Sequence, residues 1–569
     1  MKSKSNSKVY VWMISLSFII YLLSFSVACS DVLDTTSELV EFQEDNTLNH
    51  PTDSVYSVMG IVNCLQTIAD RTVLLGEARS DLMTTTDNAS ADLKRLAAFD
   101  LSQPNAYNQV ADYYAVINNC NYFLAHADTA MERRGRKLFR YEYAAVKMFR
   151  AWTYLELVKN YGQVPLVTEP LMTEREASAA AAGPRVGIKE LCEYFIDDLT
   201  PYAEVEHPVY GDIGGYPSAR FFIPGKALLG DLCLWAGRYE EAARWYNSYL
   251  NDRHDPVLPT ANRSMWTSVA VFQNPSTAYS TTADVLSFIP MEKRIFDGTI
   301  SQLPNVLNST TENNYYYQLT PSQGMRRLSA DQIYCMEYRT ETQTDTVYVP
   351  RSGFSDELMV GDLRLYTNYQ LRPMGGQDEY SEYNSQYQTI RKVQSDRVPT
   401  YRGRMVYLRY AEALCRAGYT QSAMAVLKCG LCEENNRQYI DSLERVDAAD
   451  LINFDQQVFQ KDIVIGIHSL GSGDSECNAF YTLPQPPTAL PTRRDTVEYQ
   501  IPLVEDLIVN EMALEGAFEG YRFYDLMRVA LRRGDAAYLA DAVSRRNGQT
   551  DEQLRSLLMD TKNWYLPLP

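Results

Sequence analysis

Three glutamates spaced four residues apart are the first side chains in the sequence whose types could do chemistry. Glu511, Glu515 and Glu519 would lie along one face of a helix. Neighbouring carboxylates can bind a metal ion or exchange protons with a substrate. Like charges at this spacing destabilise a helix unless cations compensate them, and Arg522 and Arg528 follow closely. The row therefore favours structural ion pairs over a catalytic or metal site.

A second candidate is the CxxC motif of Cys429 and Cys432. Redox motifs of this kind begin a helix, where the helix dipole lowers the pKa of a thiol. Here the pair follows a helical pattern, and the sequence holds no second pair that would complete a zinc site. We expect the motif to have no catalytic role, and either to be incidental or to form a local disulfide.

Other catalytic signatures are missing from the sequence. The segment Gly471-Ser472-Gly473-Asp474 lacks the lysine of a phosphate-binding loop, and no Gly-x-Ser-x-Gly motif is present. The five histidines do not have the spacing of metal ligands; they are His50, His126, His207, His254 and His468. We therefore expect no enzymatic activity, no cofactor and no metal site.

The aromatic residues are the positive signal, because 41 Tyr stand against 19 Phe and 6 Trp. Some tyrosines have helical spacing and are predicted to be core residues, namely Tyr113, Tyr154, Tyr194 and Tyr246. Others lie among polar residues, where each either packs an irregular segment or presents its ring to a ligand. A sugar ring is apolar on its faces and polar at its edge, so it needs flat aromatic side chains beside amides and carboxylates. The predicted ligand-binding residues are Asp81, Thr86, Asp87, Asn88, Trp266, Tyr279, Asn313, Tyr315 and Tyr316.

The elements that must position these residues are mostly helices. From Tyr141 to Val167, two adjacent apolar stripes predict a helix that is covered on more than one side. Gly162 and Pro165 mark its end. Further helical patterns run over 55–75, 112–127 and 188–199, and Ala177 to Gly183 reads as a small-residue linker.

Residues 225–250 and 407–430 carry small and aromatic residues at matching offsets, which is typical of tetratricopeptide-like helix pairs. Between them, Asn251 to Pro399 is polar, rich in tyrosine and weakly periodic. Thr344 to Val349 alternates as a short strand does. The pattern predicts a helical-repeat scaffold interrupted by a long irregular insertion, and such segments are usually functional.

The N-terminus resembles a processed export signal. Three lysines precede the apolar run Val9 to Phe25, which is typical of a signal peptide. Ser26-Val27-Ala28-Cys29 resembles a bacterial lipobox, in which Cys29 becomes the lipidated first residue; the alternative is an ordinary signal peptide with a cysteine at its cleavage site.

Processing would change the net charge from −19 to −22, and so acidic a chain is not expected to bind nucleic acid. Residues 30–50 are polar and acidic, as in a tether.

The remaining cysteines are odd in number once Cys29 is removed from the ten in the chain. An odd number cannot all pair internally, and we predict no disulfide framework. Four of them lie within apolar helical patterns and are expected to be buried free thiols: Cys120, Cys192, Cys233 and Cys415.

Several motifs resemble the SusD/RagB family of nutrient-binding lipoproteins. They are the run FRAWTYLELVKNYGQVPLV at 149–167, FEGYRFYDLMR at 518–528, Arg79-Ser80-Asp81, Gly361-Asp362-Leu363-Arg364 and the ending at 564–569. Gly516 and Ala517 depart from the charged residue often found there. The matches run in the family's order from Cys29 to the last residue.

The resemblance implies a mainly α fold with a tetratricopeptide-like helical-repeat scaffold, a long irregular insertion and a few short strands. It also implies a lipid-anchored protein at the cell surface, on the outer membrane, which binds an oligosaccharide and passes it to a SusC-like TonB-dependent transporter. Some relatives are thought to handle peptides. The alternatives are a helical scaffold that binds protein or peptide partners, and a surface glycan hydrolase.

The expected organisation has five parts: a signal peptide at 1–28, a lipidated tether at 29–50, an N-terminal helical region at 51–250, the ligand-binding insertion at 251–399 and a C-terminal helical region at 400–569.

Overall fold

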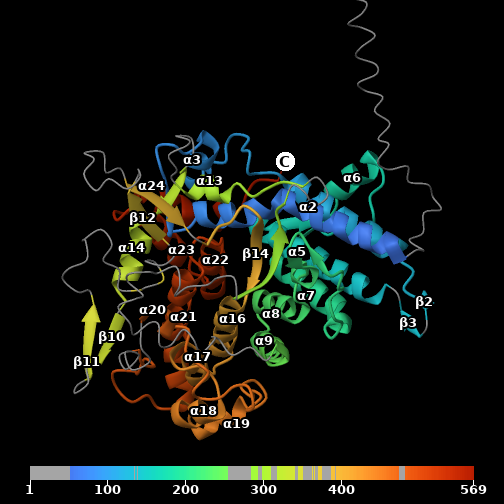
Figure 1. Cartoon of the computed structure of the whole chain (residues 1–569). Helices are drawn as coiled ribbons and strands as arrows, with labels where there is room; N and C mark the ends of the chain where they lie inside the picture. Colours follow the sequence, from blue (N-terminus) through green and yellow to red (C-terminus); the bar gives the residue numbers. More distant parts are fainter. Residues whose placement is uncertain are drawn as a thin grey trace, which may run out of the picture. The chain divides into compact units, whose positions relative to one another are not determined.

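The structure is a computed structural model (Figure 1). It describes residues 51–569 apart from 134, 138, 254–283, 293–297, 309–316, 333, 340–343, 350–361, 363, 365–368, 374–385, 391, 473–480 and 569. The described residues all belong to one compact unit, Asn49–Pro569.

The N-terminal half is a set of helices, most of which follow the predicted apolar patterns. They are α2 (Pro51–Ala78), α3 (Ala91–Ala97), α4 (Val110–His126), α5 (Arg140–Tyr161), α6 (Glu174–Ala181), α7 (Ile188–Leu199), α8 (Gly225–Ala236) and α9 (Tyr239–Arg253). By length and composition α2 is apolar enough to cross a membrane over Ser57–Ala78, but 67% of its most apolar stretch is buried in the protein. It is therefore a core helix of this fold.

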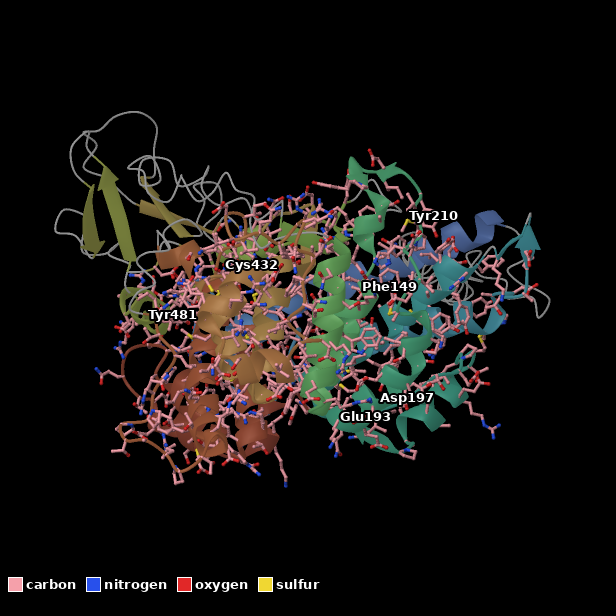
Figure 2. The ribbon with its side chains drawn as sticks, turned by 90° about the horizontal axis from the view of Figure 1, so that it is seen from below. Phe149, Glu193, Asp197, Tyr210, Cys432 and Tyr481 are labelled. Carbon is pink, nitrogen blue, oxygen red and sulfur yellow. The ribbon has the colours of Figure 1, made fainter. Side chains whose placement is uncertain are left out.

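Helix α5 confirms the buried helix predicted from its two stripes. Phe149 is fully buried and lies 5.7 Å, ring to ring, from Phe222 (Figure 2). The first stripe residue, Tyr141, is 42% exposed, so the stripe is covered only from the second turn onward. Gly162 ends the helix at a φ of 76°, a conformation that favours glycine.

The predicted linker at 177–183 is wrong, because most of it lies in helix α6. Thr173 accepts a hydrogen bond from the backbone of Glu176, whose carboxylate binds the Thr173 backbone in return, so the helix begins with a capping box. The alanines that follow are the strongest helix formers. None of its residues is buried, which is why no apolar stripe signalled it.

The C-terminal half is a second set of helices. They are α16 (Gly403–Arg416), α17 (Thr420–Lys428), α18 (Glu433–Tyr439), α19 (Ser442–Asp447), α20 (Ser469–Ser472), α21 (Arg493–Glu515), α22 (Arg522–Arg533), α23 (Ala537–Ser544) and α24 (Glu552–Leu558). Short 3-10 turns also occur: η1 (Thr200–Tyr202), η2 (Ser218–Phe221) and η6 (Thr561–Trp564).

The two tetratricopeptide-like pairs are present and lie side by side. Helix α8 packs on α9, α9 packs on α16 and α16 packs on α17, so the array continues across the insertion (Figure 1). Within the first pair, a Cβ on Gly230 would lie 2.4 Å from the Tyr246 ring. The small residue at that position therefore lets the two helices approach closely.

The segment from Val285 to Arg402, which covers most of the insertion, begins and ends on one antiparallel ladder. Strand β8 (Val285–Pro290) pairs with β14 (Arg397–Arg402), in a register that places Val398 opposite Ile289. These strands are buried, so the two ends of this segment are held together inside the protein. A long segment that is anchored in this way does not prevent α9 from packing on α16.

The described part of the insertion is more regular than predicted. It contains α13 (Leu303–Leu307), α14 (Gln323–Ala330), β9 (Leu319–Pro321), and the hairpins β10 (Tyr334–Arg339) with β11 (Thr344–Val349) and β12 (Tyr369–Pro373) with β13 (Gln386–Ile390). Strand β11 confirms the strand predicted from alternation. The other two-stranded ladders join β1 (Met83–Thr85) to β9, β2 (Glu132–Arg133) to β3 (Arg136–Lys137), β4 (Gln163–Pro165) to β5 (Arg185–Gly187) and β6 (Asp212–Ile213) to β7 (Tyr216–Pro217).

Core positions agree with the sequence in most cases. Tyr113, Tyr154 and Tyr246 are fully buried, as predicted, but Tyr194 is 38% exposed. Cys120, Cys192, Cys233 and Cys415 are buried free thiols, as predicted, and Cys64, Cys429 and Cys432 are also free.

The row of glutamates forms ion pairs, as predicted, but with other partners. Glu511 and Glu515 lie in the last turns of α21, whereas Glu519 lies beyond the end of that helix. The Glu515 carboxylate accepts hydrogen bonds from Arg402 at 2.9 Å and from Arg364 at 3.4 Å. Burial alone would raise the pKa of Glu515, but the guanidinium groups around it outweigh burial and hold that pKa below its ordinary value.

The arginines predicted to compensate the row are occupied elsewhere. Arg522 pairs with Asp81 at 2.7 Å, and Arg528 pairs with Glu412 at 2.6 Å. Both arginines project from α22 toward segments far away in the sequence, which spacing along one helix cannot reveal.

Candidate functional site

The residues of the recognisable sequence motifs meet around one buried arginine. Arg79 is fully buried at the end of α2. Its guanidinium donates to the Trp564 carbonyl at 2.9 Å and to Asn160 Oδ1 at 2.6 Å. Tyr524 also donates to Asn160 Oδ1, at 2.6 Å. The motifs at 79–81, 149–167, 518–528 and the end of the chain are thus parts of a single structural cluster.

Asp81 belongs to the same cluster. Both of its carboxylate oxygens accept hydrogen bonds from Arg522, Oδ1 at 2.7 Å and Oδ2 at 2.8 Å. The residue is only 9% exposed. Since a buried bidentate ion pair occupies both oxygens, we leave Asp81 out of the proposed ligand site.

A polar loop, Thr84 to Asp92, follows Asp81 in the sequence. It is joined to the insertion by a ladder. Strand β1 pairs with β9, and Thr84 lies opposite Thr320. Beyond the ladder, the Thr86 backbone N–H donates to the Gln318 carbonyl at 3.0 Å, and its hydroxyl donates to the Tyr317 carbonyl. The structure therefore places Thr86 against Tyr317 and Gln318, which directly follow Tyr315 and Tyr316 in the sequence.

The tip of the loop faces solvent. Asp87 and Asn88 are both exposed, and the Asp87 carbonyl accepts a hydrogen bond from Lys94 at 3.0 Å. Ser90 caps α3 and is held through its N–H by the Gln318 side chain at 2.9 Å. The backbone of the tip is thus fixed while the carboxylate and amide groups lie at the surface.

Tyr317 is a residue of this region that the predicted site list omits. Its φ of 64° is unusual for a residue that is not glycine. Its N–H donates to the Asn305 carbonyl and its hydroxyl donates to Thr320, both at 2.9 Å. A strained conformation held by such contacts is typical of functional segments. The signal in the sequence was the triple tyrosine, of which the prediction kept only the first two.

The other predicted ligand residues lie outside the described residues. They are Trp266, Tyr279, Asn313, Tyr315 and Tyr316. Cys29, the predicted lipidation site, also lies outside them.

Reactive groups are scarce among the residues that the structure describes. No three His, Cys, Asp or Glu side chains there lie close enough to hold a metal ion. Cys429 and Cys432 are free, so the local disulfide is not formed, and Cys432 instead caps α18 (Figure 2). Burial raises the pKa of the Cys429 thiol to about 12, which keeps it protonated and unreactive at neutral pH.

One enclosed cavity lies beside the buried arginine cluster. Its volume is about 50 Å³, and charged side chains line it: Glu156, Lys159, Asp231, Arg409, Glu519, Asp525 and Arg528. A buried water needs roughly 10–15 Å³ of such space, so the cavity fits a few water molecules and is too small for a sugar ring.

Comparison with known proteins identifies the fold. No protein-family model matches the chain, and no curated protein matches it. Solved structures do. A SusD superfamily protein from Bacteroides vulgatus is 14% identical, with a TM-score of 0.56 over 92% of this chain and 96% of that chain. A SusD superfamily protein from Bacteroides thetaiotaomicron is 13% identical, with a TM-score of 0.52 over 90% and 97%.

A third structure, a SusD-like carbohydrate binding protein from Bacteroides vulgatus, is 15% identical, with a TM-score of 0.51 over 84% of this chain and 83% of that chain. The likeness extends over most of each chain, and the helices and their order agree with the family motifs in the sequence. The chain therefore has the SusD-like fold, which confirms both the predicted resemblance and the predicted mainly α architecture.

Proposed function

We propose that this protein is a non-catalytic, cell-surface glycan-binding lipoprotein. In this proposal lipid on Cys29 anchors it to the outer membrane, and it passes its oligosaccharide to a SusC-like TonB-dependent transporter. The observation that carries the proposal is the SusD-like fold, shared over 84% of this chain with a protein that is itself called a carbohydrate binding protein.

The geometry of the polar loop supports the ligand class. Asp87 and Asn88 present a carboxylate and an amide at the surface, on a backbone fixed to Tyr317 and Gln318. Tyr315 and Tyr316 directly precede that point in the sequence. Such groups would bind the hydroxyl edge of a sugar while a tyrosine ring covers its face.

The site is tested with the double variant Asp87→Ala with Asn88→Ala. Both residues are exposed, so the fold should be retained. We expect the affinity for the best glycan of a panel to fall about tenfold, or about 1.4 kcal/mol, in a calorimetric titration. The matched control is Glu174→Ala with Arg175→Ala on the exposed helix α6, which should bind as the wild type does. Unchanged affinity in the loop variant would remove this loop from the site.

The anchor is tested separately with Cys29→Ala. Without the thiol no lipid can be attached, so the variant should leave the membrane fraction and no longer incorporate a labelled fatty acid. Retention of the label would contradict the lipidation site. The transporter is tested by purifying the tagged wild-type protein from native membranes in mild detergent, where a TonB-dependent transporter should copurify.

A further inference from the structure

A groove of about 850 Å³ lies where the end of the chain meets the N-terminal helices. Its walls come from the loop after α3, from β4 and β5, and from the segment 561–568. Small-molecule sites commonly measure about 300–1,000 Å³, so this groove has the size of one. None of the predicted ligand residues that the structure describes lines it.

The walls of the groove are fixed in place. The C-terminal segment is held by the Leu566 N–H, which donates to the Asn160 carbonyl at 2.8 Å, and by the Asn108 amide, which donates to the Pro567 carbonyl at 3.0 Å. In the loop after α3, Asp100 accepts hydrogen bonds from the Ser102 N–H and hydroxyl. A preformed groove loses little conformational entropy when a ligand binds.

An aromatic ring lies in the groove against the end of α5. A Cβ on Gly162 would lie 2.9–3.0 Å from atoms of the Tyr565 ring, so the absence of a side chain there lets the ring rest on the backbone. Tyr565 is half-buried, and within the described residues its hydroxyl forms no hydrogen bond. Burial raises the pKa of that hydroxyl, which therefore stays neutral and available as a donor.

The charge of the groove differs from that of the protein. Arg185 and Lys562 line different walls, are exposed and pair with no carboxylate of the described residues. Asp100 is the one carboxylate among the described residues that line the groove, and hydrogen bonds from Ser102 lower its pKa. Among the described residues that line the groove, two cations stand against one anion, a positive balance within a chain of net charge −19 that favours an anionic ligand.

We propose that this groove is a second binding site, specific for an anionic sugar unit that carries a carboxylate or a sulfate group. Arg185 presents a planar fork of donors that fits either anion, and Lys562 adds a second positive charge. The Tyr565 ring and hydroxyl would contact the sugar itself. The inference rests on the proposed function for the carbohydrate class of its ligand, but it concerns a different site with its own residues.

Calorimetric titrations with three defined probes test this. Trigalacturonate carries carboxylates, α-1,4-galactotriose is its neutral counterpart, and a sulfated galactose disaccharide represents sulfate esters. We expect at least one anionic probe to bind the wild type, and the neutral trisaccharide to bind at least about tenfold more weakly. The anionic probe that binds more tightly shows whether the groove prefers a carboxylate or a sulfate group.

The variant Arg185→Ala with Lys562→Ala locates the binding. Both side chains are exposed, so the fold should be unaffected, and the affinity for the anionic probe should fall at least about tenfold. The matched control, Arg175→Ala with Lys189→Ala, removes the same charge from exposed positions outside the groove and should leave the affinity unchanged. Tyr565→Phe, which removes only the hydroxyl, should weaken binding less.

The inference is overturned if neither anionic probe binds, if the groove variant binds as the wild type does, or if the control variant loses as much affinity as the groove variant. Failure of the proposed function gives a different result: the variant Asp87→Ala with Asn88→Ala would then bind the best glycan of the panel as the wild type does. The two sites can therefore fail independently.

Discussion

Glu77 shows how a single buried carboxyl group makes the stability of this fold depend on pH. It is 1% exposed, and one of its oxygens accepts a hydrogen bond from the Gly520 N–H at 2.9 Å. Burial raises the pKa of Glu77 to about 8, and the nearby carboxylates of Asp81 and Glu519 act in the same direction. Glu77 is therefore protonated at neutral pH.

The sign of the pH effect follows from that shift. The pKa of the folded state, about 8, lies above the ordinary value of 4.5, so the folded chain binds this proton more tightly than the unfolded chain does. The stabilising contribution is complete below pH 4.5 and is lost as the pH rises toward 8. We predict that Glu77→Gln, which mimics the neutral acid, makes the free energy of unfolding less dependent on pH in this range.

Urea unfolding at about pH 5 and about pH 8 measures the effect. Glu174→Gln on the exposed helix α6 is the control and should keep the wild-type dependence. If Glu77→Gln loses as much stability between the two pH values as the wild type does, Glu77 is not the titrating group.

Asp81 allows a structural role to be separated from a role in binding. We predict that Asp81→Asn destabilises the protein by about 3–5 kcal/mol, because the buried Arg522 keeps its charge and loses its partner. Glycan affinity of the folded fraction should stay within about twofold of the wild type. Urea unfolding and calorimetry measure the two quantities. Normal stability with lost affinity would instead return Asp81 to the ligand site.

At the scale of elements, Gly76 and Gly520 allow α2 to lie in direct contact with the turn before α22. A Cβ on Gly76 would lie 1.8 Å from the Gly520 carbonyl oxygen, and a Cβ on Gly520 would lie 2.2 Å from the Thr72 carbonyl oxygen. Gly520 also has a φ of 88°, which favours glycine. The two backbones are thus in direct contact, with no room for a side chain between them.

Gly76→Ala should therefore destabilise the protein by about 1–3 kcal/mol or more through overpacking. Gly60→Ala is a control in the same helix, since nothing lies within 4 Å of its added Cβ. It should be neutral or stabilising by up to about 1 kcal/mol, because alanine favours the helix. Thermal unfolding of both variants measures the difference, and equal effects would contradict the close contact.

The elements that the sequence predicts well are those with a buried apolar face. Helix α5, helix α7 and the two tetratricopeptide-like pairs carry apolar residues at helical spacing, because the faces that they bury require them. Helix α6 buries nothing, so propensity and capping alone form it. The hairpins of the insertion mix polar, apolar and aromatic residues, and of their four strands only β11 was predicted from the sequence.

At the scale of the whole molecule, sequence motifs revealed the fold but not the contacts that explain it. Arg79 binds the Trp564 carbonyl across 485 residues, and Arg522 binds Asp81 across 441. Spacing along the sequence predicted that Arg522 pairs with the row of glutamates. In the folded protein Arg522 pairs with Asp81, which is distant in the sequence, so spacing could not predict this contact. The joint ligand site of the polar loop and the insertion stays a prediction, whereas Tyr317 and the groove beside Tyr565 depend on backbone geometry that no motif records.

The SusD-like fold accounts for these motifs as scaffold, and the proposed ligand site lies in a surface loop. The measurement that tests this account most directly is a calorimetric titration of the wild-type protein against a panel of oligosaccharides. We predict saturable binding of at least one oligosaccharide with no change in its chain length after prolonged incubation. The absence of heat with every member of the panel, or cleavage of a bound oligosaccharide, would contradict the account.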